Sequence, residues 1–402
     1  MSYEIRPILS ALLRNRTGAV LVALQVAVSL AVLVNAAYVI KQRVQFVNRP
    51  DGMATEEIVS LRSTGFAKDY DYLANLQADL QWLNSLPDVL AAAPIRNLPL
   101  SGGGSGTGLY TQPGEKGIDA HVNYYESDHR TIEALGVKLI AGRGFRPEEI
   151  LPPTKGSEFV PQVIVTKAVV EKLFPGQTAI GKTVYDNLGQ PAVIIGIIEH
   201  MHGAWINWDS LDQVMLLPSL PPGPATRYMI RAKPGRLDAL IPQLQPGLVA
   251  LNNNRVIGEP VTQTVVKARS YLADRNMAIF LVAVGLVLAV VTALGIFSLA
   301  TFNVNSRQRQ VGTRRAIGAR RSDILRYFLV ENGMITSGGV VLGCALALLI
   351  GLWLSSAYDL PRLDLYYLVG GVFAVFLLGQ VAALQPARRA ARIAPAMATR
   401  NI

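Results

Sequence analysis

The sequence is poor in charged residues and in cysteine. Only 16% of its 402 residues are charged, whereas soluble domains average about 25%. Cys344 is the single cysteine, which excludes an intrachain disulfide and a cysteine-based metal site. The 41–277 segment is the longest part of the chain between the charge-free windows described below. An apolar core must therefore hold it together, and it is large enough to form two lobes.

Four windows contain no charged residue at all. They are 23 to 26 residues long and cover 17–40, 278–302, 333–358 and 365–387. A helix needs about 20 apolar residues to cross a bilayer, and a backbone in lipid must satisfy its own hydrogen bonds. We therefore predict transmembrane helices at 17–40, 278–302, 327–358 and 365–387. The first window is longer than the apolar region of a signal peptide, so we expect it to be retained.

The arginines indicate the orientation of these helices. Segments 1–16, 303–326 and 388–402 carry net charges of +2, +6 and +4, so the rest of the chain is slightly acidic. Basic residues gather on the cytoplasmic side of membrane proteins. We predict a multi-pass protein of the bacterial inner membrane, whose two termini and 303–326 loop are cytoplasmic. Residues 41–277 and the short 359–364 loop lie outside, and the arginines meet lipid headgroups rather than nucleic acid.

Residues 41–277 alternate short apolar runs with amphipathic stretches, which predicts a two-lobed α+β domain between the first two spans. Residues 41–47 and 261–276 are predicted stalk helices that continue the spans. Thr166 is the predicted N-cap of one helix, residues 187–190 form a hairpin turn, and glycine-rich 101–108 is a flexible loop that could contact a partner. The other predicted helices are 70–86, 130–135, 166–174 and 237–251, and the predicted strands are 58–62, 122–125, 163–165, 183–185, 192–198, 214–217 and 228–231.

Two patterns suggest chemistry but lack the context that it requires. Gly176–Thr183 reads GQTAIGKT, which satisfies the P-loop pattern. A P-loop needs a strand before it and a helix after it, whereas this segment follows a predicted helix and precedes two predicted strands. His200 and His202 share one face of a predicted strand, but no cysteine or third histidine nearby completes a metal site. We therefore predict no catalytic, cofactor or metal site in this chain.

A specific resemblance begins at residues 307–324, which read RQRQVGTRRAIGARRSDI. This segment resembles the loop after the second span of MacB/FtsX-type ABC transporter permeases, with the pattern R-x-x-E-I-G-[IT]-R-[RK]-A-[IL]-G-A. Residues 328–331 (FLVE) resemble the entry to the third span, and 386–395 (PARRAARIAP) resemble the closing motif of the family. Residues 132–145 and 173–199 resemble MacB-type extracytoplasmic domains. The residues that match the loop pattern are Arg307, Val311, Gly312, Arg314, Ala316, Gly318 and Ala319.

The resemblance covers nearly the whole chain and implies the permease subunit of an ABC transporter. Two copies, or two related permeases, would pair with two cytoplasmic ATPase subunits. Only 16 residues precede the first span, so we expect a separate ATPase to bind ATP and Mg²⁺ and this chain not to be an enzyme. A periplasmic adaptor and an outer-membrane channel are further candidate partners.

The same resemblance makes the 303–326 loop the element that couples the ATPase to the spans. Gly312 and Gly318 are expected to interrupt the helix and to leave a short crossing segment. Val311, Ala316 and Ile317 would then form an apolar ridge among arginines, which seats in a groove with an acidic rim. The predicted coupling residues are Arg307, Gln310, Val311, Arg314, Arg315, Ala316, Ile317 and Arg320. Gln310 departs from the glutamate of the family, which puts an ionic contact there in doubt.

Other residues are assigned to the helices themselves. Ser322 is the predicted N-cap of the third span, with Asp323 beside it favouring the helix dipole. Gly339 and Gly343 form a GxxxG pair and predict a close helix contact. The isolated polar residues within the spans are expected to hydrogen bond between helices; these are Gln25, Asn35 and Gln380.

No ionisable residue lies in the middle of a span, so the sequence offers no proton relay or ion path. This favours a protein that transmits motion from ATP hydrolysis to its outer domain, for export or efflux with an adaptor. Two alternatives remain open. One is an ABC complex that releases lipoproteins or regulates cell-wall hydrolases, and the other is a membrane sensor that does not transport.

Overall fold

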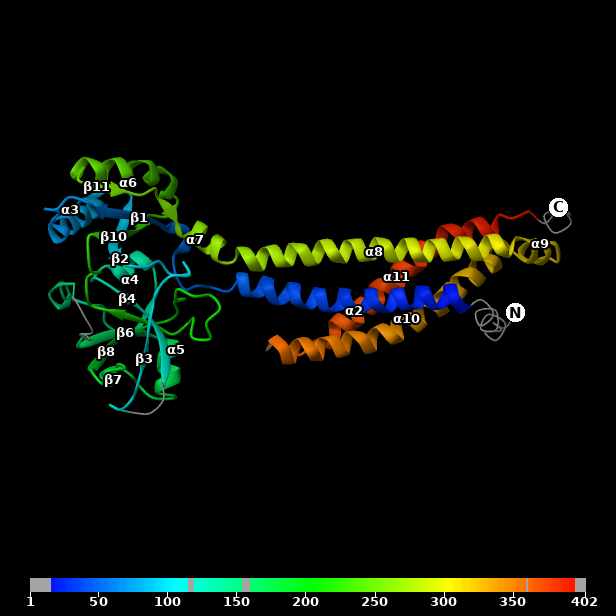
Figure 1. The fold of residues 1–402 in the computed structure, drawn as a ribbon, viewed down its shortest axis with the longest axis horizontal. Helices are drawn as coiled ribbons and strands as arrows, with labels where there is room; N and C mark the ends of the chain where they lie inside the picture. Colours follow the sequence, from blue (N-terminus) through cyan, green and yellow to red (C-terminus); the bar gives the residue numbers. More distant parts are fainter. Residues whose placement is uncertain (1–15, 115–118, 154–159, 359–360, 395–402) are drawn as a thin grey trace. The chain divides into compact units, whose positions relative to one another are not determined.

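The computed structural model describes residues 16–114, 119–153, 160–358 and 361–394 (Figure 1). The predicted cytoplasmic residues 1–15 and 395–402, and two residues of the predicted 359–364 loop, lie outside these ranges. The chain divides into two compact units. Residues 49–273 form one unit, which we call the intervening domain, and the helices on either side of it form the other, which we call the helical unit.

Within the described residues, the helical unit contains four helices that are long and apolar enough to cross a membrane. They are α2 (Arg16–Val47), α8 (Leu272–Ser306), α10 (Arg321–Tyr358) and α11 (Leu365–Ala391), and the short α9 (Gln308–Ala316) joins α8 to α10. The four predicted spans are confirmed as helices, and 41–47 continues the first of them as predicted.

Helices α2 and α10 approach each other closely at two glycines of α10. A Cβ atom on Gly339 would lie 2.6 Å from the carbonyl oxygen of Ala23, and one on Gly343 would lie 2.9 Å from that of Ala27. Contacts below 3.0 Å are not tolerated by real Cβ atoms. Only glycine allows the two backbones to pack at this distance, as small residues generally do between membrane helices.

Polar side chains bond between the spans. The Gln25 amide of α2 donates to the carbonyl of Val291 in α8 at 2.9 Å. The Asn35 amide donates to the carbonyl of Ala347 in α10 at 3.1 Å. The expectation that these two residues link helices is therefore confirmed. A polar group that is paired in this way costs little in an apolar surrounding, whereas an unpaired one is expensive.

The first sheet of the intervening domain is antiparallel. Its strands run in the order β11 (Arg255–Ile257), β1 (Ile58–Gly65), β10 (Ala225–Ala232) and β2 (Val89–Ile95), and β12 (Val261–Thr262) also pairs with β1. Helices α3 (Tyr72–Ser85) and α6 (Leu237–Leu251) bury their leucines against one face of it. The helix predicted at 237–251 is confirmed at both ends.

The second sheet of the intervening domain is mixed. Its order is β3 (Ser105–Leu109), β4 (Ala120–Glu126), β9 (Val214–Leu217), β6 (Gln162–Thr166), β8 (Pro191–Ile198) and β5 (Leu139–Gly142), and β7 (Thr183–Tyr185) also pairs with β8. Strand β6 runs parallel to β8 and antiparallel to β9. The short helices α4 (Thr131–Leu135) and α5 (Lys167–Leu173) precede β5 and follow β6, and the 3-10 turns η1 (Thr55–Glu57) and η2 (Pro147–Glu149) complete the domain.

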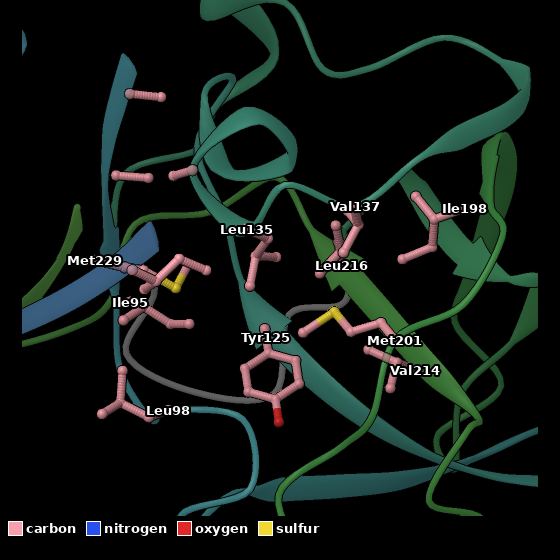
Figure 2. Packing of buried hydrophobic residues seen from close by; sticks show 14 of the residues in the cluster. Ile95, Leu98, Tyr125, Leu135, Val137, Ile198, Met201, Val214, Leu216 and Met229 are labelled. Atoms are coloured by element: carbon pink, nitrogen blue, oxygen red, sulfur yellow. The ribbon is translucent and has the colours of Figure 1, made fainter. Parts of the chain in front are cut away.

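One apolar cluster contains residues of both sheets. Figure 2 shows Ile95 and Met229 of the first sheet on one side of Tyr125, and Val214 and Leu216 of the second sheet on the other. All five side chains are buried. The described residues thus form two lobes with a shared core, in agreement with the predicted two-lobed α+β domain.

Several local predictions for this domain are wrong. Residues 105–108 are not part of a flexible loop, because they form β3 and pair with β4. Residues 261–276 are not one stalk helix: β12 is followed by α7 (Gln263–Ser270), a break at Tyr271, and then α8. Thr166 is the N-cap residue of α5 as predicted, although its hydroxyl makes no cap hydrogen bond. Strands β2, β5 and β11 were not predicted.

Candidate functional site

The α9 helix is bounded by two breaks in the chain. Arg307 leaves the helical conformation and separates α8 from α9. At the other end Gly318 has a φ of +102°, a left-handed conformation that favours glycine. The Ala319 amide donates to the Arg314 carbonyl at 3.0 Å, and the Gly318 amide donates to the Arg315 carbonyl at 3.2 Å. This pair of bonds is a Schellman motif, which ends the helix sharply.

The structure corrects two expectations about this segment. Gly312 does not break the helix, because it lies inside α9 and is buried. Val311 is not exposed: it is 5% accessible and packs with Val304, Phe328 and Ala387. Val311 therefore anchors α9 to the helical unit. Ile317, by contrast, is 82% exposed.

An ion pair joins the start of α9 to α10. The Arg307 guanidinium lies 3.0 Å from a carboxylate oxygen of Glu331 and donates to the Tyr327 hydroxyl at 3.2 Å. Glu331 is buried. The guanidinium of Arg314 lies 4.8 Å from the centre of the Tyr327 ring. These contacts fix α9 against α10.

Helix α10 begins differently from the prediction. It starts at Arg321, so Ser322 lies inside the helix and is not its N-cap. The Asp323 carboxylate accepts a hydrogen bond from the Arg320 amide at 2.9 Å. Asp323 therefore reaches back to the amide of the residue just before the helix, at the helix end where a negative charge is favourable.

The predicted coupling residues thus divide into two groups. Val311 and Arg307 face the helical unit, and Arg315 is half-buried. The others form a surface that we call the exposed α9 face, and its residues are Gln310, Arg314, Ala316, Ile317 and Arg320. This face is an isoleucine and an alanine surrounded by polar and basic side chains.

The P-loop string at residues 176–183 follows a helix and precedes a strand, as the sequence predicts. Helix α5 ends at Leu173, before the string, and Thr183 begins strand β7. The string therefore joins a helix to a strand, which is the reverse of a P-loop. The ammonium group of Lys182 lies 4.4 Å from the centre of the Phe174 ring, which gives this lysine a local packing role.

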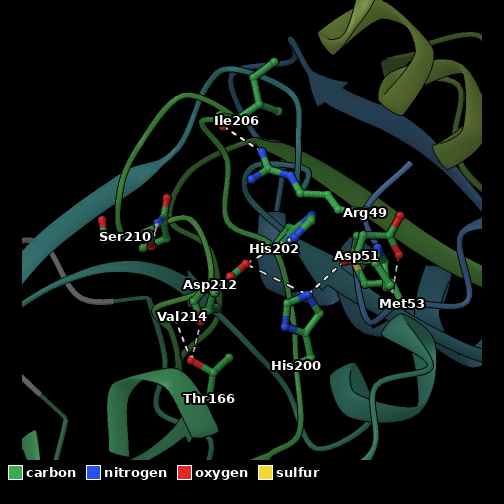
Figure 3. Close-up of polar contacts among 12 residues, drawn as sticks. Arg49, Asp51, Met53, Thr166, His200, His202, Ile206, Ser210, Asp212 and Val214 are labelled. Atoms are coloured by element: carbon green, nitrogen blue, oxygen red, sulfur yellow. Dashed lines mark hydrogen bonds and ion pairs between the residues drawn. The ribbon is translucent and has the colours of Figure 1, made fainter. Parts of the chain in front are cut away.

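The structure adds Asp212 to the two histidines that the sequence analysis singled out. His200 and His202 lie just after β8 rather than on it, and Asp212 lies just before β9 (Figure 3). Because β6 is parallel to β8 and antiparallel to β9, the end of β8 and the start of β9 meet at one end of the sheet. The Thr166 hydroxyl at the end of β6 donates to the Asp212 carbonyl at 2.7 Å and accepts from the Val214 amide at 3.0 Å.

The side chains of this cluster lie close together. Nε2 of His202 is 3.1 Å from Oδ1 of Asp212, and Nε2 of His200 is 3.9 Å from the same atom. Burial lowers the pKa of His202, although Asp212 opposes the shift. Contact with His202 lowers the pKa of Asp212, and the charges of His200 and Arg49 act in the same direction. Near neutral pH the cluster therefore presents neutral imidazole at His202 and a carboxylate at Asp212.

Asp51 supports the cluster from the other side. Its carbonyl accepts from the His202 amide at 3.1 Å. Its carboxylate accepts from the Met53 amide at 3.1 Å, the Thr55 hydroxyl at 2.9 Å and the Lys267 ammonium at 2.8 Å. Burial alone would raise the pKa of Asp51, but these hydrogen bonds bring it below its ordinary value.

Two family models match the chain. The model for the MacB-like periplasmic core domain covers residues 20–246, and the model for the FtsX-like permease C-terminal covers residues 282–395. These matches define the chain as a permease of the ABC transporter class. The first model alone covers more than half of the residues, so the chain belongs to the MacB/FtsX-type family of permeases.

Named relatives share low sequence identity with this chain but match most of its length. The macrolide export ATP-binding/permease protein MacB of Shewanella sp. (strain ANA-3) is 26% identical over 79% of this chain and 48% of its own length. MacB of Acinetobacter baylyi is 25% identical over 88% of this chain and 52% of its own length. The chain therefore spans about half the length of these MacB relatives. The uncharacterized ABC transporter permease YknZ of Bacillus subtilis is 25% identical over 71% of each chain.

Among solved structures, the periplasmic region of MacB from Actinobacillus actinomycetemcomitans matches 56% of this chain and 97% of its own, with 14% identity and a TM-score of 0.36. The extracellular domain of YknZ matches 49% of this chain and 98% of its own, with 13% identity and a TM-score of 0.32.

Proposed function

We propose that this chain is the membrane subunit of an exporter and that a separate ABC ATPase drives it through the exposed α9 face. ATP and Mg²⁺ are bound by that ATPase. The observation that carries the proposal is Ile317, which is 82% exposed at the end of a helix that is otherwise fixed to the spans. A large apolar side chain among arginines suits a groove with an acidic rim on a partner.

Orientation follows from charge. Arginines flank the spans on the α9 side, so α9 and both termini are assigned to the cytoplasm and the intervening domain to the outer side of the bacterial inner membrane. A second copy or a related permease completes the complex. Export is supported by relatives whose names specify export of macrolides, pyoverdine and syringafactin. A periplasmic adaptor and an outer-membrane channel would complete the path in a two-membrane cell.

In mechanical terms, closure of the ATPase pair moves α9. The Arg307–Glu331 pair and the buried Val311 oblige α8 and α10 to follow. Since α8 leads directly from the intervening domain to α9, its displacement is the route by which the motion reaches that domain. The interior of the spans needs no charged path for this kind of work.

The test is copurification of a co-expressed cognate ATPase with the Ile317→Asp variant. Full burial of an isoleucine is worth about 1.5–3 kcal/mol, so its loss should weaken the association by roughly 10- to 150-fold. Ile140→Asp is the matched control, because Ile140 is also exposed but lies in the intervening domain. Wild-type levels of ATPase bound to Ile317→Asp would show that α9 is not the docking element.

A further inference from the structure

We propose that His200, His202 and Asp212 bind a divalent transition-metal ion in the intervening domain, with Zn²⁺ the best chemical fit. The two histidines alone did not suggest this site, because the third ligand lies ten residues further along the chain. The fold supplies it by joining the end of β8 to the start of β9.

The distances suit one shared ion. The Asp212 Oδ1 atom is 3.1 Å from Nε2 of His202 and 3.9 Å from Nε2 of His200, and one ligand atom from each residue lies within 4.8 Å of the others. Zinc bonds to nitrogen and oxygen are about 2.0–2.2 Å long, which places ligand atoms roughly 3.4 Å apart in a tetrahedral site. Nε2 of His200 lies 2.9 Å from the carbonyl oxygen of Pro50, and rotation of the partly exposed His200 side chain would exchange that contact for the ion.

Two atoms of the cluster lack partners. Oδ1 of Asp212 and Nδ1 of His202 are buried without a hydrogen-bond partner among the residues that the structure describes. Buried polar atoms without partners are rare and often mark the place of a water molecule or an ion. A cation would bridge Nε2 of His202 and Oδ1 of Asp212, which lie 3.1 Å apart without a well-directed hydrogen bond between them.

The surrounding charges are compatible with a cation. The Lys138 ammonium is paired with the Glu199 carboxylate at 3.1 Å. The Arg49 guanidinium donates to the carbonyl of Ile206 at 2.8 Å, which directs it toward that loop (Figure 3). Imidazole nitrogen selects a transition metal over Mg²⁺ or Ca²⁺, which prefer oxygen ligands.

The backbone of the site is already held in place. Gly52 has a φ of +78°, and a Cβ atom there would lie 2.1 Å from the carbonyl oxygen of His200. The amide of His202 is bonded to Asp51, and the carbonyl of Asp212 is bonded to Thr166. Because the backbone is fixed, only side-chain rotation is needed to bring the ligands together. The adjoining cavity of about 430 Å³ leaves room for water as a fourth ligand.

The experiment uses the full-length chain, purified in detergent without a polyhistidine tag and stripped with EDTA. Zn²⁺ binding at pH 7.5 is measured by competition with a fluorescent chelator, and Co²⁺ is added separately to detect the visible absorption bands of a tetrahedral site. His200→Ala and Asp212→Asn are the test variants, since both side chains reach the surface. His121→Ala, an exposed histidine on β4, is the matched control.

We expect one Zn²⁺ per chain in the wild type and in His121→Ala, and affinity at least about tenfold weaker in each test variant. Mg²⁺ at the same concentration should not compete. Absence of stoichiometric Zn²⁺ binding by the wild type would overturn the proposal. So would affinity in both test variants equal to that of His121→Ala, which would place the ion elsewhere.

Discussion

The buried ion pair between Asp79 and Arg255 allows a quantitative prediction about the intervening domain. Asp79 lies on α3 and Arg255 on β11, and both side chains are almost completely inaccessible to solvent. Arg255 donates from Nη2 to Oδ1 of Asp79 at 2.8 Å and from Nη1 to Oδ2. It also donates to the carbonyls of Leu248 and Asn252. The Tyr228 hydroxyl completes the set by donating to Asp79 at 2.5 Å.

Replacing Arg255 by Met should destabilise the domain by about 3–5 kcal/mol. The substitution leaves the Asp79 carboxylate buried with the Tyr228 hydroxyl as its remaining partner among those described. It also removes a donor from the buried carbonyl of Leu248 and from the partly buried carbonyl of Asn252. Most of this cost comes from leaving a charge buried without a counter-charge. The double variant Asp79→Leu/Arg255→Met should therefore recover a large part of the lost stability, since replacing both partners by apolar residues is often near neutral.

The assay is urea unfolding of the full-length chain in detergent, followed by tryptophan fluorescence. Trp82 is a local probe, because its ring packs directly against Gly247 where α3 meets α6. Arg236→Met is the matched control, since Arg236 pairs with Asp88 at the surface. A solvent-exposed pair contributes only about 0–1 kcal/mol. The reasoning is refuted if Arg255→Met costs no more than Arg236→Met, or if the double variant is as unstable as the single one.

Three further perturbations test other parts of the structure. Gly339→Leu should separate α2 from α10 and lower the thermal stability of the purified protein, whereas Gly338→Leu should leave it unchanged, because a Cβ at Gly338 meets nothing within 4 Å. Arg307→Leu leaves the buried Glu331 without its ion-pair partner and loosens α9. Hydrogen exchange of the α9 amides should speed up by tenfold or more, because a loss of about 1.4 kcal/mol of local stability corresponds to a factor of ten. Because the pKa of Asp51 is lowered, its contribution is complete above pH of about 4 and is lost on further acidification. Asp51→Asn should therefore flatten the acid limb of a stability–pH curve.

The membrane helices were predictable because the cause is local. A charge-free run of more than about 20 residues has few stable conformations other than a spanning helix. The strand at 214–217 was predictable from its short continuous apolar run, and the helix at 237–251 from leucines four residues apart. The turn at 187–190 follows from Gly189, whose φ is +76°.

The errors share a different cause, which is contact between distant segments. Residues 105–108 look like a flexible loop, yet β4 provides a complete set of pairing partners for them. The hydroxyl of Thr166 suits a helix cap, but the backbone around Asp212 and Val214 provides its partners instead. Val311 was predicted to be exposed because the residues that bury it, Phe328 and Ala387, lie on other helices and far along the chain.

The amino-acid sequence alone was thus sufficient to predict the spans, the position of the large domain between the first two spans, and the family. It identified the α9 segment but not which of its side chains are free to meet a partner. The pairing of Arg307 with Glu331, of Arg255 with Asp79, and of two histidines with Asp212 arose only when the folded chain brought them together. Such pairings depend on strand order and helix packing, which no local period or composition encodes.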